Sequence, residues 1–148
     1  MFSGDLEFLS NFSRYSCELD DVEYPTVENA FQAAKLPYPS DRVEHFKLNQ
    51  VSPAEAKRIG RSVQLRPDWE QIKLPTMRLL LASKFTFHSG LASMLVATGN
   101  LHLVETNTWH DQIWGDCICG ASKCASPGQN LLGSSLMWLR FYLAGGNA

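Results

Sequence analysis

The sequence YPTVENAFQAAK, from Tyr24 to Lys35, decides the fold of the N-terminal half of the chain. Thr26 has the side-chain oxygen that a helix N-cap requires, and no helix breaker follows it before Lys35. Pro37 and Pro39 would end the helix, because proline lacks an amide hydrogen and clashes with the preceding turn. The stretch therefore predicts a helix over 27–35, of about two and a half turns.

Two charged residues of this predicted helix, Glu28 and Lys35, lie nearly two full turns apart and project from one face. Phe31 and Gln32 lie between them. In a pocket wall, burial would lower the pKa of the lysine, making it a nucleophile or base, and would raise that of the glutamate, making it a general acid. The alternative is a solvent-exposed helix face with two unpaired charges, which is the commoner arrangement.

Turn and capping patterns place the elements on either side of this helix. The runs Tyr15–Leu19 and Val22–Pro25 flank the turn-forming pair Asp20-Asp21 and predict a β-hairpin. After the helix, the sequence from Ser52 to Glu55 is a capping box with proline at the first helical position. It predicts a helix that continues to about Arg61.

The C-terminal half is predicted to contain three helices, a capped turn and one strand. Asp68 is expected to cap a turn over Trp69–Lys73. Pro75 fits the start of a helix better than its middle. The other predicted elements are a helix over Thr76–Phe85, a short helix from Ser89 that stops at Gly99, a strand over Leu101–Glu105 and a buried helix over Leu131–Leu143. Helix dominates, so the predicted class is α+β, predominantly helical, with a few short strands.

Length and composition bound the possible classes of protein. A chain of 148 residues is expected to form one domain, 1–148, with a sizeable core. A hydrophobic content of 45% with 19% charged residues excludes a disordered or coiled-coil chain. The net charge of -2 argues against avid, sequence-independent DNA binding. No stretch is long and apolar enough for a membrane span, and the N-terminal residues do not resemble a signal peptide, so the expected location is cytoplasmic.

A second candidate site is the loop from Thr108 to Asp116, which contains Trp109, His110, Asp111, Trp114 and Gly115. Tryptophans in a loop either bury themselves or stack on a ligand ring, and the histidine and aspartate supply proton-transfer groups. The alternative is that the tryptophans plug the core.

The residues before the last helix, Pro127 to Gly133, suggest a phosphate site. Free amides at a helix start bind phosphate, and Gly128 would let a ligand approach closely. The alternative is an ordinary capped helix with Asn130 as the N-cap.

Three clustered cysteines, Cys117, Cys119 and Cys124, raise the question of a metal. A structural zinc site needs four ligands, and Cys17 or His110 could supply the fourth. The usual spacing of zinc ligands is C-x2-C, however, and the sequence has no second cysteine pair. Reduced thiols without a metal are therefore favoured, and zinc is the alternative.

Two further features hint at a pocket. Lys84, at the end of a leucine-rich helix, could either extend out of the core or reach the pocket. The segment from Phe8 to Phe12 is neither a good helix nor a good strand, and a buried Asn11 would need partners, which suggests a binding loop.

Taken together, these motifs resemble the NADAR (YbiA-like) family. The matching stretches are FLSNF at 8–12, YPTVENAFQAAK at 24–35, ASKF at 82–85, LVATG at 95–99, DxxWG at 111–115 and NLLGSSLMWLR at 130–140. The sequence departs from the family pattern at Asn29, where histidine is often found, and in the cysteine-containing extension of its loop.

The resemblance implies an N-glycosidase that needs no cofactor and cleaves a base–ribose or amine–ribose bond. Two substrate classes are implied: ADP-ribose attached to guanine in DNA or nucleotides, and phosphorylated intermediates of riboflavin biosynthesis. A third possibility, a module that binds ADP-ribose or NAD without catalysis, stays open. No membrane partner and no stable nucleic-acid complex are expected, and nothing demands more than a monomer.

The predicted site residues combine the resemblance with the motifs above. Lys35, Glu28 and Asp111 are the predicted catalytic residues, with Lys35 as a Schiff-base nucleophile and Glu28 as a proton shuttle. The predicted substrate-binding residues are Asn11, Phe12, Phe31, Gln32, Lys84, Trp109, Trp114, Gly115, Gly128 and Asn130.

Overall fold

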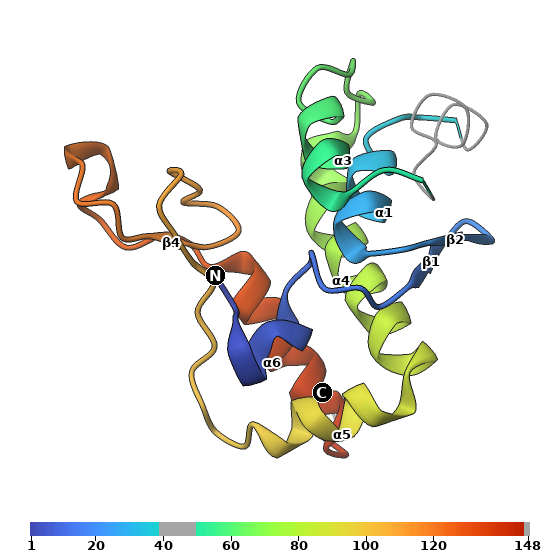
Figure 1. The fold of residues 1–148 in the computed structure, drawn as a ribbon, viewed down its shortest axis with the longest axis vertical. Coiled ribbons are helices and arrows are strands. Elements are labelled where there is room, and N and C mark those ends of the chain that lie inside the picture. The colour runs from blue at the N-terminus through green and yellow to red at the C-terminus, as the bar shows by residue number, and fades with distance from the viewer. Residues whose placement is uncertain (39–49, 147–148) are drawn as a thin grey trace. The chain divides into compact units, whose positions relative to one another are not determined.

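The computed structural model describes residues 1–38 and 50–146 (Figure 1). Contacts divide the chain into two compact units. The central unit comprises Asn11–His88, and the terminal unit combines Met1–Ser10 with Ser89–Ala148. The predicted α+β class with predominant helix is confirmed, whereas the single domain over 1–148 stays a prediction.

The central unit begins with the predicted hairpin. Strands β1 (Cys17–Leu19) and β2 (Val22–Tyr24) pair antiparallel, with Cys17 opposite Tyr24. Asp20 and Asp21 both have positive φ, 51° and 60°, which suits the tight turns whose twist matches that of a hairpin.

Three helices complete the described part of the central unit: α1 (Val27–Ala33), α3 (Pro53–Ile59) and α4 (Trp69–Phe87). The predicted caps of α1 and α3 are present, since Thr26 Oγ1 accepts from the Asn29 amide and Ser52 Oγ from the Glu55 amide. Helix α1 packs against both α3 and α4. Helix α1 ends before Lys35, and Pro39 lies outside the described residues.

Helix α4 corrects the prediction of a break at Pro75. The helix is continuous over Trp69–Phe87 and includes the proline. Its buried residues lie on both sides of Pro75, from Trp69 to Phe85, and their burial outweighs the hydrogen bond that proline cannot donate. Asp68 precedes the helix but makes no capping bond, because its carboxylate pairs with Arg66 at 2.6 Å.

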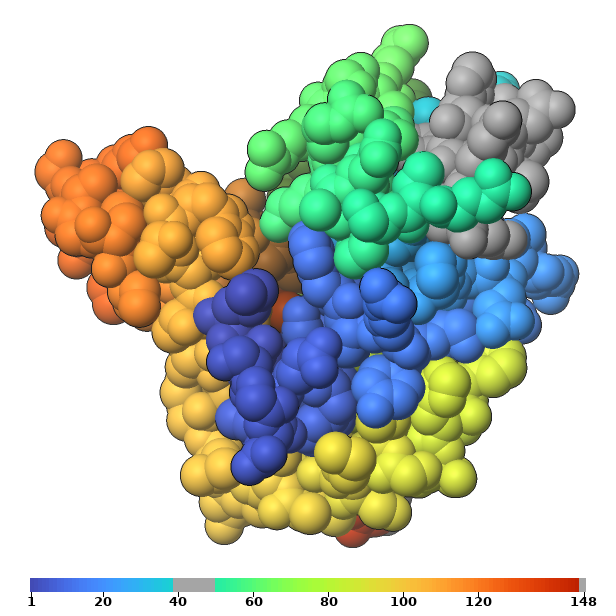
Figure 2. Space-filling view, viewed as in Figure 1, coloured from blue at the N-terminus to red at the C-terminus, as the bar shows by residue number. Residues whose placement is uncertain are grey.

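The terminal unit contains the 3-10 helix η1 (Gly4–Leu9) and the helices α5 (Ser89–Ala97) and α6 (Leu131–Leu143), of which α5 and α6 pack together. Both α-helices were predicted. Between them lie two-residue strands β3 (Thr106–Asn107) and β4 (Asp116–Cys117), which pair parallel, and the 3-10 helix η2 (Ser122–Cys124). In the space-filling view, this segment forms the orange lobe (Figure 2).

The predicted strand over Leu101–Glu105 is wrong. These residues are irregular, and the first residue in a strand is Thr106. The side chain of Asn130 accounts for the difference, because it accepts from the Glu105 amide at 3.0 Å and donates to the Leu103 carbonyl at 2.8 Å. It occupies backbone groups that a neighbouring strand would otherwise pair.

Within the described residues, no single helix has the length and apolar character needed to cross a membrane. The consecutive helices α4 and α5 meet that test only when taken together across a bend, by length and composition alone.

Candidate active site

Helix α1 presents a buried polar pair in the central unit. Glu28 and Gln32 are each 5% exposed, and the Gln32 amide nitrogen donates to Glu28 Oε1 at 2.8 Å. They lie four residues apart, the spacing that brings side chains together on a helix. The Glu28 backbone amide donates to the carbonyl of Asn11 at 3.0 Å, which ties the predicted binding loop to the start of α1.

Lys35 reaches the same region from just beyond the helix. Its Nζ donates to the carbonyl of Gly60, the C-cap of α3, at 2.7 Å. Burial lowers the pKa of Lys35, while the nearby carboxylate of Glu28 acts in the opposite direction. A lysine with a lowered pKa beside a carboxylate is a combination typical of catalytic sites. The alternative of a solvent-exposed face with two unpaired charges is therefore wrong, because Glu28 is buried and Lys35 is half-buried and both have hydrogen-bond partners.

Gly60 completes this group through its lack of a side chain. A Cβ atom at Gly60 would lie 1.9 Å from Gln32 Oε1. The absence of that atom lets the Gln32 amide fit between Glu28 and the end of α3. The sequence analysis gave Gly60 no role, because no local pattern shows which side chain a glycine faces.

Among the described residues of the central unit, two buried acceptor oxygens have no hydrogen-bond partner. They are Asn11 Oδ1 and Gln32 Oε1, and both residues are more than nine-tenths buried. The Asn11 amide nitrogen contacts a weak acceptor, Met77 Sδ, at 3.5 Å. A buried acceptor without a partner is costly, so both oxygens suit a ligand that brings hydroxyl or N–H donors.

Two aromatic residues, Phe12 and Phe31, are next in the chain to Asn11 and Gln32. Phe31 is buried against Trp69, with ring centroids 5.1 Å apart. Lys57 Nζ lies 5.7 Å from the centroid of the Phe12 ring. Phe12 and Phe31 were predicted as site residues, whereas Trp69 and Lys57 were not, because each lies on a different helix from the motif.

Lys84 and Asn29 form hydrogen bonds with other groups of the central unit. Lys84 is 0% exposed, and its Nζ donates to Ser13 Oγ at 2.7 Å, so it does not extend out of the core. Asn29 bonds to Thr26 Oγ1 and to the carbonyl of Val51. The family departure at Asn29 therefore affects the local structure of α1 rather than the pair formed by Glu28 and Gln32.

The tryptophan loop belongs to the terminal unit. Asp111 Oδ1 accepts from the amides of Ile113 and Trp114, at 3.1 and 2.9 Å, which fixes the direction of the carboxylate. Trp109 is 45% exposed and Trp114 half-buried. Core plugging is therefore wrong for Trp109, whose open ring suits stacking on a base.

The predicted phosphate site is occupied by the protein itself. The Gly128 amide donates to Asp116 Oδ1 at 2.8 Å, and the amides of Asn130, Leu131 and Leu132 donate to carbonyls of residues 113–115. Cβ atoms at Gly115 and Gly128 would each lie 2.1 Å from a backbone carbonyl oxygen. In this structure, Gly115, Gly128 and Asn130 hold the loop against the start of α6, and no phosphate-binding amides are left at 128 and 130–132.

These features match a known family. A model of the NADAR domain matches residues 2–144. The chain belongs to the NADAR family. It is 40% identical over 144 residues to N-glycosidase YbiA of Escherichia coli (strain K12), covering 96% of this chain and 84% of that protein. The NMR structure of E. coli YbiA is similar, with a TM-score of 0.79 and 37% identity, covering 97% of this chain and 82% of that one.

Two further relatives bear on function. N-glycosidase Npun_R5314 of Nostoc punctiforme is 37% identical over 134 residues, covering 88% of this chain and 81% of that protein. Riboflavin biosynthesis protein VVA0006 of Vibrio vulnificus is 33% identical over 135 residues, covering 90% of this chain but only 34% of that protein. The names of the NADAR-family N-glycosidases support a glycosyl hydrolase as the class of this chain.

Proposed function

We propose that this NADAR-family chain is an N-glycosidase that removes ADP-ribose from ADP-ribosylated guanine in DNA or nucleotides. The observation that carries the proposal is the group formed by the buried Glu28 and Gln32 with the half-buried Lys35, whose pKa is lowered by desolvation. The acceptor oxygens of Asn11 and Gln32 that have no partner suit the N–H groups of guanine or the hydroxyls of ribose.

The reaction follows from the chemistry of a glycosylamine. The nitrogen attached to the sugar expels the ring oxygen, which takes up a proton and leaves an imine-like carbon. The neutral amine of Lys35 attacks that carbon, and the guanine amino group leaves with a proton. The resulting Schiff base is hydrolysed by water, which releases ADP-ribose and regenerates the lysine amine.

Within the central unit, Glu28 carries the proton between the ring oxygen, the leaving amine and Lys35. Asp111 and Trp109 belong to the terminal unit and keep the roles predicted for them from the sequence. Asp111, whose carboxylate is oriented by two backbone amides, would hold ribose hydroxyls or activate water, and Trp109 would stack on a base.

The test is release of free ADP-ribose from a guanine-ADP-ribosylated DNA oligonucleotide, followed by mass spectrometry. The wild type should release ADP-ribose and intact guanine, and K35A should not. The matched control is K73A, because Lys73 is a lysine of the same unit paired with Glu70 on the surface of α4. Borohydride added during turnover should trap an adduct on Lys35. Normal activity in K35R, with no adduct, would replace the Schiff base by acid–base hydrolysis led by Glu28 and Asp111.

The name of the Vibrio vulnificus relative favours a second candidate, hydrolysis of phosphorylated riboflavin-biosynthesis intermediates. Such a ribosylamine contains the same kind of bond, so Lys35 and Glu28 would act in the same way. Cleavage of this compound without release of ADP-ribose from the oligonucleotide would select the second candidate. Tight ADP-ribose binding in calorimetry with neither product would overturn both and indicate a binding module.

A further inference from the structure

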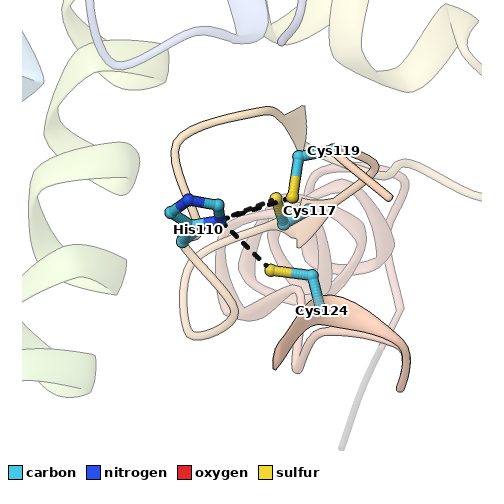
Figure 3. Close-up of side chains that lie close together, drawn as sticks. All are labelled: His110, Cys117, Cys119 and Cys124. Atoms are coloured by element: carbon cyan, nitrogen blue, oxygen red, sulfur yellow. Dashed lines mark hydrogen bonds between the residues drawn. The ribbon is translucent and has the colours of Figure 1, made fainter. Parts of the chain in front are cut away.

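Four side chains of the terminal unit converge on one point outside the residues assigned to catalysis. They are His110, Cys117, Cys119 and Cys124, here called the Cys3His group (Figure 3). Their ligand atoms all lie within 4.8 Å of one another. The fourth cysteine, Cys17, belongs to strand β1 of the central unit and is not a member, so of the two residues considered for a fourth ligand, the structure selects His110.

The distances match the edges of a metal tetrahedron. His110 Nδ1 lies 3.3 Å from Cys119 Sγ, 3.4 Å from Cys124 Sγ and 3.9 Å from Cys117 Sγ. With Zn–S bonds of about 2.3 Å and Zn–N bonds of about 2.0–2.1 Å, a tetrahedral zinc ion separates a nitrogen from each sulfur by about 3.6 Å. The same nitrogen of the imidazole therefore faces all three sulfurs at the spacing that one shared ion requires.

The backbone around the group has features of a built ligand site. His110 has a φ of 69°, a conformation that residues other than glycine rarely adopt and that here directs its ring toward the sulfurs. Gly120 has a φ of 77°, and beyond this turn the Ala121 amide donates to Cys119 Sγ at 3.4 Å. This N–H···S bond fixes the direction of the Cys119 side chain, as is typical of the bonds that orient metal ligands.

A second layer of hydrogen bonds holds the ligands in place. Gln112 Oε1 accepts from the Cys117 amide at 2.8 Å, and Gln112 Nε2 donates to the Ser126 carbonyl at 2.7 Å. Gln112 thus links the segments that carry Cys117 and Cys124. Support of this kind fixes the direction of metal ligands.

We propose that the Cys3His group binds one zinc ion in a structural site. Three thiolates with one imidazole favour zinc over magnesium or calcium, which prefer oxygen ligands. Four protein ligands fill the tetrahedron and leave no position for a water molecule or substrate, so the ion has a structural role. It cross-links the loop from His110 to Cys124, and Trp109 and Asp111 flank its histidine ligand.

The test is the metal content of the full chain, purified without a metal-affinity tag from zinc-supplemented cells and measured by inductively coupled plasma mass spectrometry. The expected result is one equivalent of zinc in the wild type and less than about one tenth of an equivalent in C119S and H110A. H102A is the matched control, because His102 is an exposed histidine of the same unit outside the group, and it should retain the full equivalent.

Cobalt keeps the proposal testable if a variant fails to fold. Wild-type protein stripped of metal and loaded with Co²⁺ should show the strong visible bands of tetrahedral coordination together with sulfur-to-cobalt charge transfer, and zinc should abolish both. Absence of zinc from the wild type together with absence of these bands would overturn the proposal. Iron in place of zinc would overturn the assignment of the metal.

Discussion

Glu28 and Gln32 lie on a helix whose seven residues are all buried, whereas Asp111 lies in a loop in which Trp109 and His110 are exposed. In the central unit, helix packing buries the polar side chains and leaves acceptor oxygens of Asn11 and Gln32 without partners. In the terminal unit, side chains such as Asn130 and Asp111 bond to backbone groups and hold the loop. Buried polar groups with unpaired acceptors suit the binding and reaction of a ligand. Side chains that bond to the backbone suit a different task, which is to hold an exposed loop in one conformation.

The largest expected effect comes from removing the lysine of the central unit. K35A should lower kcat/KM for release of ADP-ribose by roughly a thousandfold or more, because the nucleophile is lost. Stability should change far less, because only the bond from Nζ to the Gly60 carbonyl is removed. Steady-state kinetics and thermal unfolding measure the two effects. A variant that loses stability and activity in proportion would show that Lys35 is structural.

The next largest effect should appear in the terminal unit, as a loss of stability rather than of catalysis. N130A removes two hydrogen bonds to Leu103 and Glu105 and places alanine at a φ of 50°, so it should lower the free energy of unfolding by about 2–4 kcal/mol. Denaturant titration measures the change. N100A, at an exposed asparagine, should stay within about 0.5 kcal/mol of the wild type. Equal stability of the two variants would contradict a holding role for Asn130.

Gly60 tests whether space near Gln32 matters for activity. In G60A the new Cβ would displace the Gln32 amide from Glu28, so kcat/KM should fall by roughly tenfold while stability falls by only about 1 kcal/mol, because a flexible side chain can move aside. G90A is the matched control, since a Cβ at Gly90 meets no atom within 4 Å. Unchanged kinetics in G60A would show that the position of the Gln32 amide is unimportant.

The pH dependence should give a smaller, graded effect. Burial lowers the pKa of Lys35, and only its neutral form attacks, so kcat/KM should rise with pH and level off above that pKa, with about tenfold per pH unit on the rising limb. Stability changes in the same direction, because between the two pKa values the unfolded lysine binds a proton that the folded one has lost. A pH–rate profile with K73A as control tests this, and a limb that falls with rising pH would contradict it.

Much of the helical structure could be predicted from sequence because its signals are local. Thr26 and Ser52 cap helices through their own neighbours, and the helices α5 and α6 were expected where they lie. Pro75 misled the prediction because burial of the helix against residues far away in the chain outweighs the hydrogen bond that proline cannot donate. The strand expected over Leu101–Glu105 failed for a similar reason, since Asn130 lies 25 residues beyond Glu105.

The candidate site also has a part that local sequence signals predict and a part that depends on contacts distant in sequence. Glu28, Gln32 and Lys35 could be found from helical spacing and family resemblance, although α1 stops at Ala33 and Lys35 reaches Gly60 from the turn beyond it. Gly60 and Trp69 come from other helices, and no spacing within the motif indicates them. The sequence left His110 and Cys17 as alternatives for a fourth metal ligand. It could not choose between them, because which loop side chains meet depends on the folded backbone.

Cys17 gives the central unit an internal reporter of unfolding. It is 0% exposed in strand β1, and burial raises the pKa of its thiol to about 12. Because alkylating reagents react with thiolates, Cys17 should be modified only when the hairpin opens. The other cysteines all lie in the terminal unit, in the proposed zinc site, so mass spectrometry after brief alkylation distinguishes the Cys17 peptide from theirs. Modification of Cys17 then measures opening of the hairpin in an unlabelled sample.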